Sequence, residues 1–291
     1  MTLFPQHTDL QASLVIPKLL LYISKTIQFF SKKLATLLGV KLFTTPLRFR
    51  TPKRELAMEK SAQKKSLLVS SINKNIHIVS YGFSKKKVLL VHGWAGRSTQ
   101  LFAFADKLLE NGYMVIAFDG PAHGKSDGKT ALMPEFLETI KSIEKAYGPF
   151  NAAIGHSFGG FCLTNAVANH LQVKSLVTIG ASNIISDVLL NFTRNLGLKP
   201  IISKKMKSYF DKKWGEDVNG FSSSYKAKEI RVPTLVVHDT QDGDVAVSCA
   251  LEIRQNLQKG TLLITHGLGH TKILRNRKVV NQVVSFIKQH S

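Results

Sequence analysis

A serine flanked by glycines, at the junction of two apolar segments, constrains this chain more than any other feature of its sequence. Gly155-His156-Ser157-Phe158-Gly159 separates a short apolar run, residues 152–154, from a helix-like run, residues 158–171. A strand that turns directly into a helix strains the residue at the turn, and the flanking glycines avoid a clash across it. The pattern predicts a Ser157 hydroxyl above a sheet edge, at a helix N-terminus that favours developing negative charge. The same five residues also suit a junction with an idle serine, so function depends on what accompanies them.

Strand-like and helix-like segments alternate on both sides of this motif. Buried-strand patterns span 88–92, 113–118, 152–156, 174–180, 234–238 and 261–265, and helical patterns span 99–110, 134–146, 158–171, 246–258 and 272–289. Two β-branched runs, 67–72 and 76–80, indicate a hairpin at the start of this region. The order predicts an α/β domain over residues 67–291, with a mostly parallel central sheet and helices on both faces.

Residues 182–228 interrupt that alternation. They combine several aromatic residues with many lysines and contain no β-branched run. We expect a helical insertion above the sheet edge that acts as a lid or cap. Its apolar and aromatic character suggests an acyl or aromatic substrate.

The first 66 residues precede the predicted α/β domain. Within the apolar stretch 15–40, lysines at 18, 25 and 32 share one helical face with Ser24, Gln28 and Ser31, and the opposite face carries Leu20, Ile23, Ile27, Phe30, Leu34 and Leu37. The lysines interrupt every window long enough to span a membrane, and the signal-peptide pattern is absent. Two interpretations stay open: a helix packed on the main domain, or a basic amphipathic helix on a membrane surface. Residues 44–65 are predicted to be a connector.

The net charge of +21 and the pI near 10.0 are the unusual features of the composition. Basic residues concentrate in 18–65, 194–228 and 271–291, and the last of these stretches has no acidic residue. Solvated lysines are the ordinary interpretation, and an anionic surface such as lipid head groups is the next. We expect no nucleic-acid partner because no groove-reading motif or basic patch interleaved with aromatics occurs. The oligomeric state is left open.

The two cysteines, Cys162 and Cys249, lie far apart in apolar helical runs, so we expect buried thiols rather than a disulfide or a metal site. This favours a cytoplasmic location, peripheral at the membrane under the second interpretation of residues 15–40. His92, His156 and His238 do not have the spacing of metal ligands. The loop 120–126 is one residue too short between its glycines to be a phosphate-binding loop. We expect neither a metal nor an organic cofactor.

A nucleophilic serine needs a base, and a candidate follows the last predicted strand. It is His270, in the glycine-rich loop His266-Gly267-Leu268-Gly269-His270. His266 is the competing candidate, but we expect it to pack at the strand terminus.

An acid to orient the base and donors for an oxyanion are also present. Asp242 is the candidate acid, in a loop after the strand at 234–237. Asp239 and Asp244 share that loop and could instead cap the next helix or bind the turn backbone. Asp187 is a more remote alternative to Asp242. The candidate oxyanion donors are the backbone N–H groups of Trp94 and Phe158, since Gly93 lets the chain turn close to the serine; His92 is then structural.

The chain order Ser157, Asp242, His270, with gaps of 85 (242 − 157) and 28 (270 − 242) residues, resembles the α/β-hydrolase superfamily over residues 67–291. The matching stretches are 92–94, 119–126, 155–159, 239–245 and 269–270. Many members have Arg-Gly-His-Gly where this chain has Pro-Ala-His-Gly at 121–124, a difference that should not affect the chemistry.

By this resemblance, Ser157 is the nucleophile, His270 the general base and acid, Asp242 the orienting acid, and Trp94 and Phe158 the oxyanion hole. The resemblance implies hydrolysis of a carboxylic ester or related acyl bond in a small-molecule substrate. Hydrolysis of a thioester, an amide or a carbon–carbon bond by the same residues is the alternative within the fold. A non-catalytic, membrane-associated binding protein on this scaffold is the alternative from another class.

Overall fold

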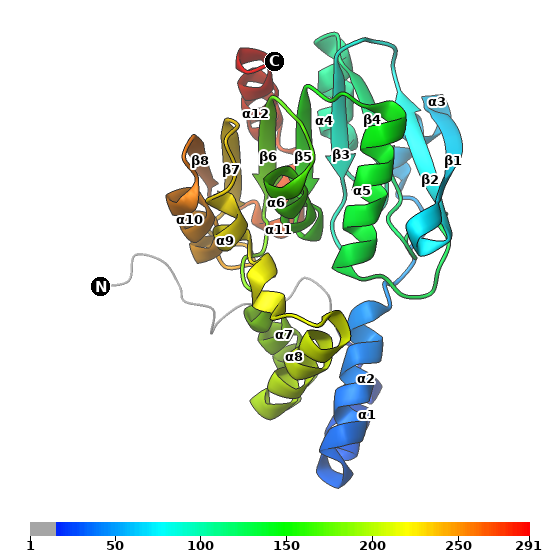
Figure 1. The fold of residues 1–291 in the computed structure, drawn as a ribbon, viewed down its shortest axis with the longest axis vertical. Helices are drawn as coiled ribbons and strands as arrows, with labels where there is room; N and C mark the ends of the chain where they lie inside the picture. Colours follow the sequence, from blue (N-terminus) through cyan, green and yellow to red (C-terminus); the bar gives the residue numbers. More distant parts are fainter. Residues whose placement is uncertain (1–15) are drawn as a thin grey trace.

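The structure is a computed structural model that describes residues 16–291. Val15, the first residue of the predicted N-terminal apolar stretch, lies outside the described residues. The described chain forms a central sheet flanked by helices, with a group of further helices at one end (Figure 1).

The central sheet has eight strands in the described part of the chain, in the order β1-β2-β4-β3-β5-β6-β7-β8. The strands are β1 (Gln63–Val69), β2 (Lys74–Tyr81), β3 (Lys87–Val91), β4 (Met114–Phe118), β5 (Ala152–His156), β6 (Ser175–Ile179), β7 (Thr234–Asp239) and β8 (Gly260–Thr265). β2 pairs antiparallel with both β1 and β4, and every pair from β4 to β8 is parallel. The predicted fold class is therefore confirmed.

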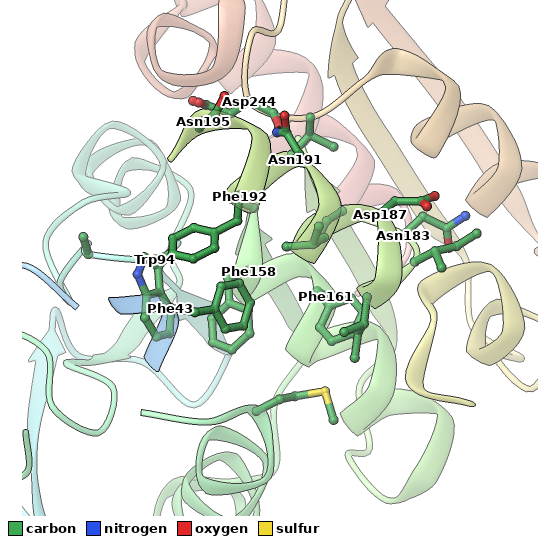
Figure 2. A pocket seen from close by; sticks show the side chains of 18 of the residues that line it. Phe43, Trp94, Phe158, Phe161, Asn183, Asp187, Asn191, Phe192, Asn195 and Asp244 are labelled. Carbon is green, nitrogen blue, oxygen red and sulfur yellow. The ribbon is translucent and has the colours of Figure 1, made fainter. Parts of the chain in front are cut away.

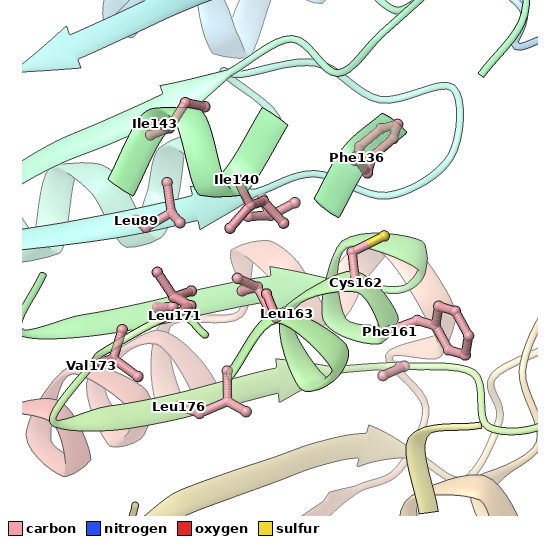
Figure 3. Close-up of a cluster of buried hydrophobic side chains, with 14 of the residues drawn as sticks. Leu89, Phe136, Ile140, Ile143, Phe161, Cys162, Leu163, Leu171, Val173 and Leu176 are labelled. Carbon is pink, nitrogen blue, oxygen red and sulfur yellow. The ribbon is translucent and has the colours of Figure 1, made fainter. Parts of the chain in front are cut away.

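Helices cover both faces of the sheet because strands buried on two sides need an apolar layer on each. One face is covered by α5 (Met133–Tyr147), α6 (Phe158–Asn169) and α10 (Val247–Asn256), and the other by α4 (Phe102–Glu110) and α12 (Arg277–Gln289). Figure 3 shows the first layer, where Phe136, Ile140 and Ile143 of α5 and Cys162 and Leu163 of α6 meet the side chains of the strands. Both cysteines are buried free thiols.

Two predicted elements have different boundaries in the structure. The run 67–72 is not all strand, because β1 begins at Gln63 and residues Ser70–Ile72 form the 3-10 turn η3, which Asn73 closes with a φ of 48°. The predicted helix 272–289 consists of α11 (Gly269–Lys272), η5 (Ile273–Arg275) and α12. The Asn276 side chain accepts hydrogen bonds from the Lys278 and Val279 amides, so it starts a new helix there.

Residues 182–228, which we call the insertion, are mainly helical. It contains α7 (Ile185–Asn195), α8 (Pro200–Trp214), η4 (Val218–Phe221) and α9 (Ser223–Ala227). α7 and α8 lie beyond the end of the sheet, whereas α9 packs on the core beside α6 (Figure 1). Leu189 of α7 and Ile202, Met206 and Phe210 of α8 form a small apolar core of their own.

The predicted single N-terminal helix is two helices, α1 (Lys18–Phe30) and α2 (Lys32–Thr44). Ser31 separates them because its backbone is extended and its hydroxyl accepts a hydrogen bond from the Leu34 amide, which caps α2. α2 packs on α8, where Ala35 and Val40 join the apolar core of the insertion. In the described part of the chain, no helix is both long and apolar enough to cross a membrane.

The predicted connector, 44–65, is more structured than expected. It contains η2 (Lys53–Glu55), α3 (Leu56–Ser61) and the start of β1. The Arg48 guanidinium donates hydrogen bonds to the carbonyl oxygens of Ala122, Ser126 and Gly128, which ties this segment to the loop after β4. These contacts were not predicted because they join residues more than 70 positions apart.

Candidate active site

The backbone turns from β5 into α6 at Ser157. β5 ends at His156, α6 begins at Phe158, and Ser157 itself has a φ of 52° and a ψ of −119°. A Cβ atom at Gly155 would lie 2.6 Å from the backbone of Gly159, and one at Gly159 would lie 2.3 Å from the Val91 carbonyl oxygen. Both glycines are therefore required sterically, as the sequence pattern predicts. The strained turn lifts Ser157 to the wall of a cavity.

His270 and Asp242 are joined by a short hydrogen bond. The His270 Nδ1 atom lies 2.7 Å from the Asp242 Oδ2 atom, and both side chains are largely buried. The other carboxylate oxygen of Asp242 accepts hydrogen bonds from the backbone amides of Asp244 and Val245, each at 2.9 Å. The carboxylate is thus held in place from one side and offered to the imidazole on the other.

The pKa values of this pair are shifted in opposite directions. Burial by itself would raise the pKa of Asp242, but the hydrogen bond and the charge of His270 hold it below its usual value. Burial would lower the pKa of His270, but the hydrogen bond to Asp242 and its negative charge raise it above 6.5, with Asp244 contributing. An imidazole of this kind is a stronger base than a free histidine.

Two residues close to Ser157 contact the His270–Asp242 pair: His156, which precedes Ser157 in the chain, and Gly180, which follows Ile179 at the end of β6. The His156 Nε2 atom lies 3.0 Å from the His270 carbonyl oxygen, and the two rings are 4.6 Å apart. A Cβ atom at Gly180 would lie 3.2 Å from both Asp242 Oδ2 and His270 Nδ1, while the Ser157 amide donates to the carbonyl of Ile179. Ser157, Asp242 and His270 therefore follow the carboxyl ends of β5, β7 and β8, and Gly180 at the end of β6 lies against the histidine–aspartate pair.

The loop after β3 passes directly beside the serine. A Cβ atom at Gly93 would lie 3.1 Å from the Ser157 Cβ atom. The Nδ1 atom of His92 lies 2.7 Å from the Gly93 carbonyl oxygen, and its Nε2 atom accepts a hydrogen bond from the Gly120 amide at 2.8 Å. Because the carbonyl and the N–H of one trans peptide point in opposite directions, His92 fixes the direction of the Trp94 N–H. Phe158 supplies the second predicted N–H, at the first position of α6.

The other candidate residues, Asp239, His266 and Asp187, have three different surroundings. Asp239 accepts hydrogen bonds from the Gln241 and Leu268 amides and the Thr265 hydroxyl, so it holds together the two loops that carry Asp242 and His270. His266 is exposed and hydrogen-bonded to Thr240, so the expectation that it packs was wrong. Asp187 lies on α7 and lines the cavity.

His238 is a buried neighbour of Asp242, a position that was not predicted because His238 was considered only as a metal ligand. Its Nε2 atom lies 2.9 Å from the Val245 carbonyl oxygen and 3.4 Å from Asp242 Oδ2. Burial lowers the pKa of His238 below its ordinary value, against the opposing charge of Asp242, and this favours the neutral imidazole. Its position at the end of β7, four residues before Asp242, was the available signal.

Ser157 faces a largely apolar cavity of about 390 Å³. Figure 2 shows Phe43, Trp94, Phe158 and Phe192 gathered on one side and Asn183 and Asp187 on the other. Phe43 comes from α2; its ring lies 5.1 Å from that of Phe192 and 6.3 Å from that of Trp94. The cavity is thus lined by the N-terminal segment as well as by the insertion. The sequence did not predict this contribution.

One group of side chains among the described residues has the spacing to hold a metal ion, namely Asp242, Asp244 and His270. Two of these are already hydrogen-bonded to each other, which is the arrangement of an acid and a base rather than of two ligands. His92, His156 and His238 do not form such a group within the described chain.

Two family descriptions match the chain in adjacent regions. Residues 86–199 match the alpha/beta hydrolase fold family, and residues 212–290 match the family described as TAP-like protein. No curated protein matches the sequence.

Solved structures share the fold at low sequence identity. A putative lipase (lip1) from Acinetobacter baumannii AYE is 20% identical with a TM-score of 0.63, over 83% of this chain and 97% of its own. A membrane phospholipase A is 19% identical with a TM-score of 0.63, over 93% and 96%. An esterase (EaEST) from Exiguobacterium antarcticum is 20% identical with a TM-score of 0.59, over 78% and 100%.

Proposed function

The chain belongs to the α/β-hydrolase superfamily, and we propose that it is a serine hydrolase that cleaves carboxylic esters with an apolar acyl group. The observation that carries this proposal is the 2.7 Å hydrogen bond between His270 and Asp242 beside the strained Ser157, at the wall of an apolar cavity. The similar structures that are named lipase, phospholipase or esterase are in keeping with an ester substrate.

The first half of the reaction forms an acyl-enzyme. His270, oriented through Nδ1 by Asp242, takes the Ser157 proton at Nε2 while the serine oxygen attacks the ester carbonyl. The negative charge that develops on the carbonyl oxygen is received by the backbone N–H groups of Trp94 and Phe158. His270 then gives its proton to the departing alcohol as the ester C–O bond breaks.

The second half releases the acid. Water gives a proton to His270 and attacks the acyl carbon, the same two N–H groups receive the oxyanion, and the proton returns to Ser157. Asp242 remains ionised throughout and stabilises the imidazolium, in agreement with its lowered pKa.

Labelling with a fluorophosphonate probe tests the nucleophile. Wild type should be labelled, and Ser157→Ala and His270→Ala should not. Two matched controls should keep the label: Ser182→Ala, which changes another serine of the cavity wall, and His266→Ala, which changes an exposed histidine four residues before His270. Folded wild-type protein that remains unlabelled would support the non-catalytic alternative instead.

A series of p-nitrophenyl esters tests the acyl group. Each CH₂ buried in the cavity contributes about 0.8 kcal/mol, or roughly four-fold in kcat/KM, until the cavity is filled. We expect kcat/KM to rise with chain length and then level off. The same kcat/KM for acetate and longer acyl esters would contradict an apolar acyl specificity, without affecting the assignment of the nucleophile.

A further inference from the structure

The helix α1 exposes most of its aromatic side chains to solvent, whereas Ser24 and Gln28 lie with Leu20 and Ile27 on its packed side. Ser24 is fully buried, and the Gln28 side chain accepts a 2.6 Å hydrogen bond from the Lys199 amide at the start of α8. On the outer side, Phe29 is 85%, Phe30 79%, Tyr22 71% and Leu19 70% exposed. An amphipathic helix at the surface of a water-surrounded protein turns its large apolar side chains toward the core, so the exposure of these four is unusual.

These exposed side chains form one surface on α1. Leu19, Tyr22, Ile23 and Phe30 follow the spacing i, i+3, i+4 and i+11, which places them on one side of a helix. The Phe29 ring lies edge-on to that of Phe30 at 5.3 Å. Leu34 and Leu37 of α2 are also exposed. A group of apolar side chains of this size indicates an interaction site.

The charges around this surface indicate what it contacts. Lys18 and Lys25 of α1 and Lys32, Lys33 and Lys41 of α2 are all exposed, and neither helix contains an acidic residue. The whole chain has a net charge of +21. Aromatic and aliphatic side chains flanked only by lysines suit the interface of a membrane that contains anionic lipids, where the rings enter the head-group region and the ammonium groups meet phosphates.

We propose that the α1–α2 pair docks on anionic phospholipid bilayers through Leu19, Tyr22, Ile23, Phe29 and Phe30. The pair extends beyond the body of the protein, away from the sheet (Figure 1), so the bilayer can meet it without obstruction from the sheet. A bilayer accounts for both features of the surface, because a second copy of the chain would bring a further +21 of like charge to it.

Docking in this way also places the cavity near the lipid. Leu42 and Phe43 in the last turn of α2, and Leu47 just after it, line the cavity that contains Ser157. An apolar acyl chain could therefore pass from the bilayer to the nucleophile along one continuous segment. This second step rests on the proposed function, whereas the docking itself does not.

Co-sedimentation with vesicles tests the docking. Wild type should pellet with vesicles of phosphatidylcholine and phosphatidylglycerol and pellet poorly with phosphatidylcholine alone. The double variant Phe29→Ser/Phe30→Ser should bind at least roughly ten-fold more weakly, because it lacks the two rings that would be buried in the bilayer. Phe83→Ser is the matched control, since Phe83 is 86% exposed in the turn between β2 and β3, and it should bind like wild type.

The charge contribution has its own matched pair. Lys18→Glu/Lys33→Glu should weaken binding to the anionic vesicles by at least roughly thirty-fold, because each of the two lysines near such a surface contributes about 1 kcal/mol. Lys85→Glu/Lys141→Glu makes the same net change at exposed positions outside α1 and α2 and should bind more tightly than the first pair. Equal loss in both pairs would show that only the net charge matters and would contradict a specific surface.

Two further outcomes would overturn the proposal. Wild-type protein that stays in the supernatant with anionic vesicles would show that the bilayer is not the partner. A wild-type dimer that Phe29→Ser/Phe30→Ser converts to monomer would assign the surface to a second copy. Ser157→Ala should bind vesicles like wild type, so failure of the proposed reaction and failure of docking are separable. If both proposals hold, Phe29→Ser/Phe30→Ser loses activity on vesicle-embedded esters and keeps it on soluble ones.

Discussion

At the scale of single residues, the proposed chemistry depends on the protonation of His270. Asp242 and Asp244 raise its pKa above 6.5 against the effect of burial. The base must be neutral to accept the Ser157 proton, so kcat/KM for a soluble ester should rise with pH along a one-proton limb whose midpoint lies above 6.5.

Removing the carboxylate reverses that shift. Asp242→Asn should move the rising limb of the kcat/KM–pH profile to lower pH. It should also reduce the plateau value of kcat/KM by about 10⁴-fold, because the imidazole loses both its orientation and its charge partner. Asp244→Asn should move the limb in the same direction by less. A wild-type limb centred at or below 6.5 would contradict the role given to Asp242.

The backbone of Ser157 gives a prediction about stability. A side chain at a φ of 52° is strained, and strain of this kind is about 1–3 kcal/mol, whereas glycine adopts such angles freely. Ser157→Gly should therefore unfold at a higher urea concentration than Ser157→Ala, by roughly 1 kcal/mol in the free energy of unfolding, while both variants are inactive. Equal stability of the two variants would show that the turn stores no strain.

The sequence indicates the nucleophile more firmly than the acid. The glycines around Ser157 are a local steric requirement, so the turn can be predicted from five residues. The choice among Asp239, Asp242 and Asp244 depends on which carboxylate the distant His270 loop reaches, and spacing does not contain that information. The structure shows the distinction, since Asp239 binds three loop groups and Asp242 binds His270.

At the scale of elements, the alternation of strands and helices was predictable because each buried strand is a short apolar run bounded by turns. The break between α1 and α2 was not predicted, because apolar periodicity continues across Ser31 and the capping hydroxyl is a single residue. The packing of α2 on α8 could not be predicted from the sequence for a different reason. Ala35 of α2 and Met206 of α8 belong to one apolar cluster although they are about 170 positions apart in the sequence, and no sequence pattern marks such a pair.

α2 also gives a prediction about substrate length. Phe43 forms part of the cavity wall with Trp94, Phe192 and Phe210. Phe43→Ala should enlarge the cavity and shift the preferred acyl chain of soluble esters toward longer lengths, with lower kcat/KM for short ones. Phe49→Ala is the control, because Phe49 belongs to the same N-terminal segment, is half exposed and does not line this cavity. An unchanged chain-length profile for Phe43→Ala would remove the N-terminal segment from the substrate site.

At the scale of the whole molecule, two surfaces contribute to the proposed activity, one through apolar contacts and the other through electrostatic attraction. The cavity around Ser157 is largely apolar, so binding of a neutral ester there should respond little to salt. The exterior carries a net charge of +21, and its attraction to anionic lipid acts through water and is screened. Ionic strength can therefore separate recognition of the bilayer from recognition of the acyl chain.

Raising NaCl from 0.05 to 0.5 M shortens the screening length to less than half, to about 4 Å. Binding to phosphatidylglycerol vesicles and hydrolysis of vesicle-embedded esters should then fall together, by roughly ten-fold or more, since several lysines lose their contribution. Hydrolysis of a soluble short-chain ester, measured in the same buffers, should change by less than about two-fold. Vesicle binding that persists in high salt but is lost in Phe29→Ser/Phe30→Ser would mean that the apolar side chains dominate docking. A parallel loss of soluble-ester activity would instead place the salt effect in the fold or the cavity, and the separation of the two surfaces would be wrong.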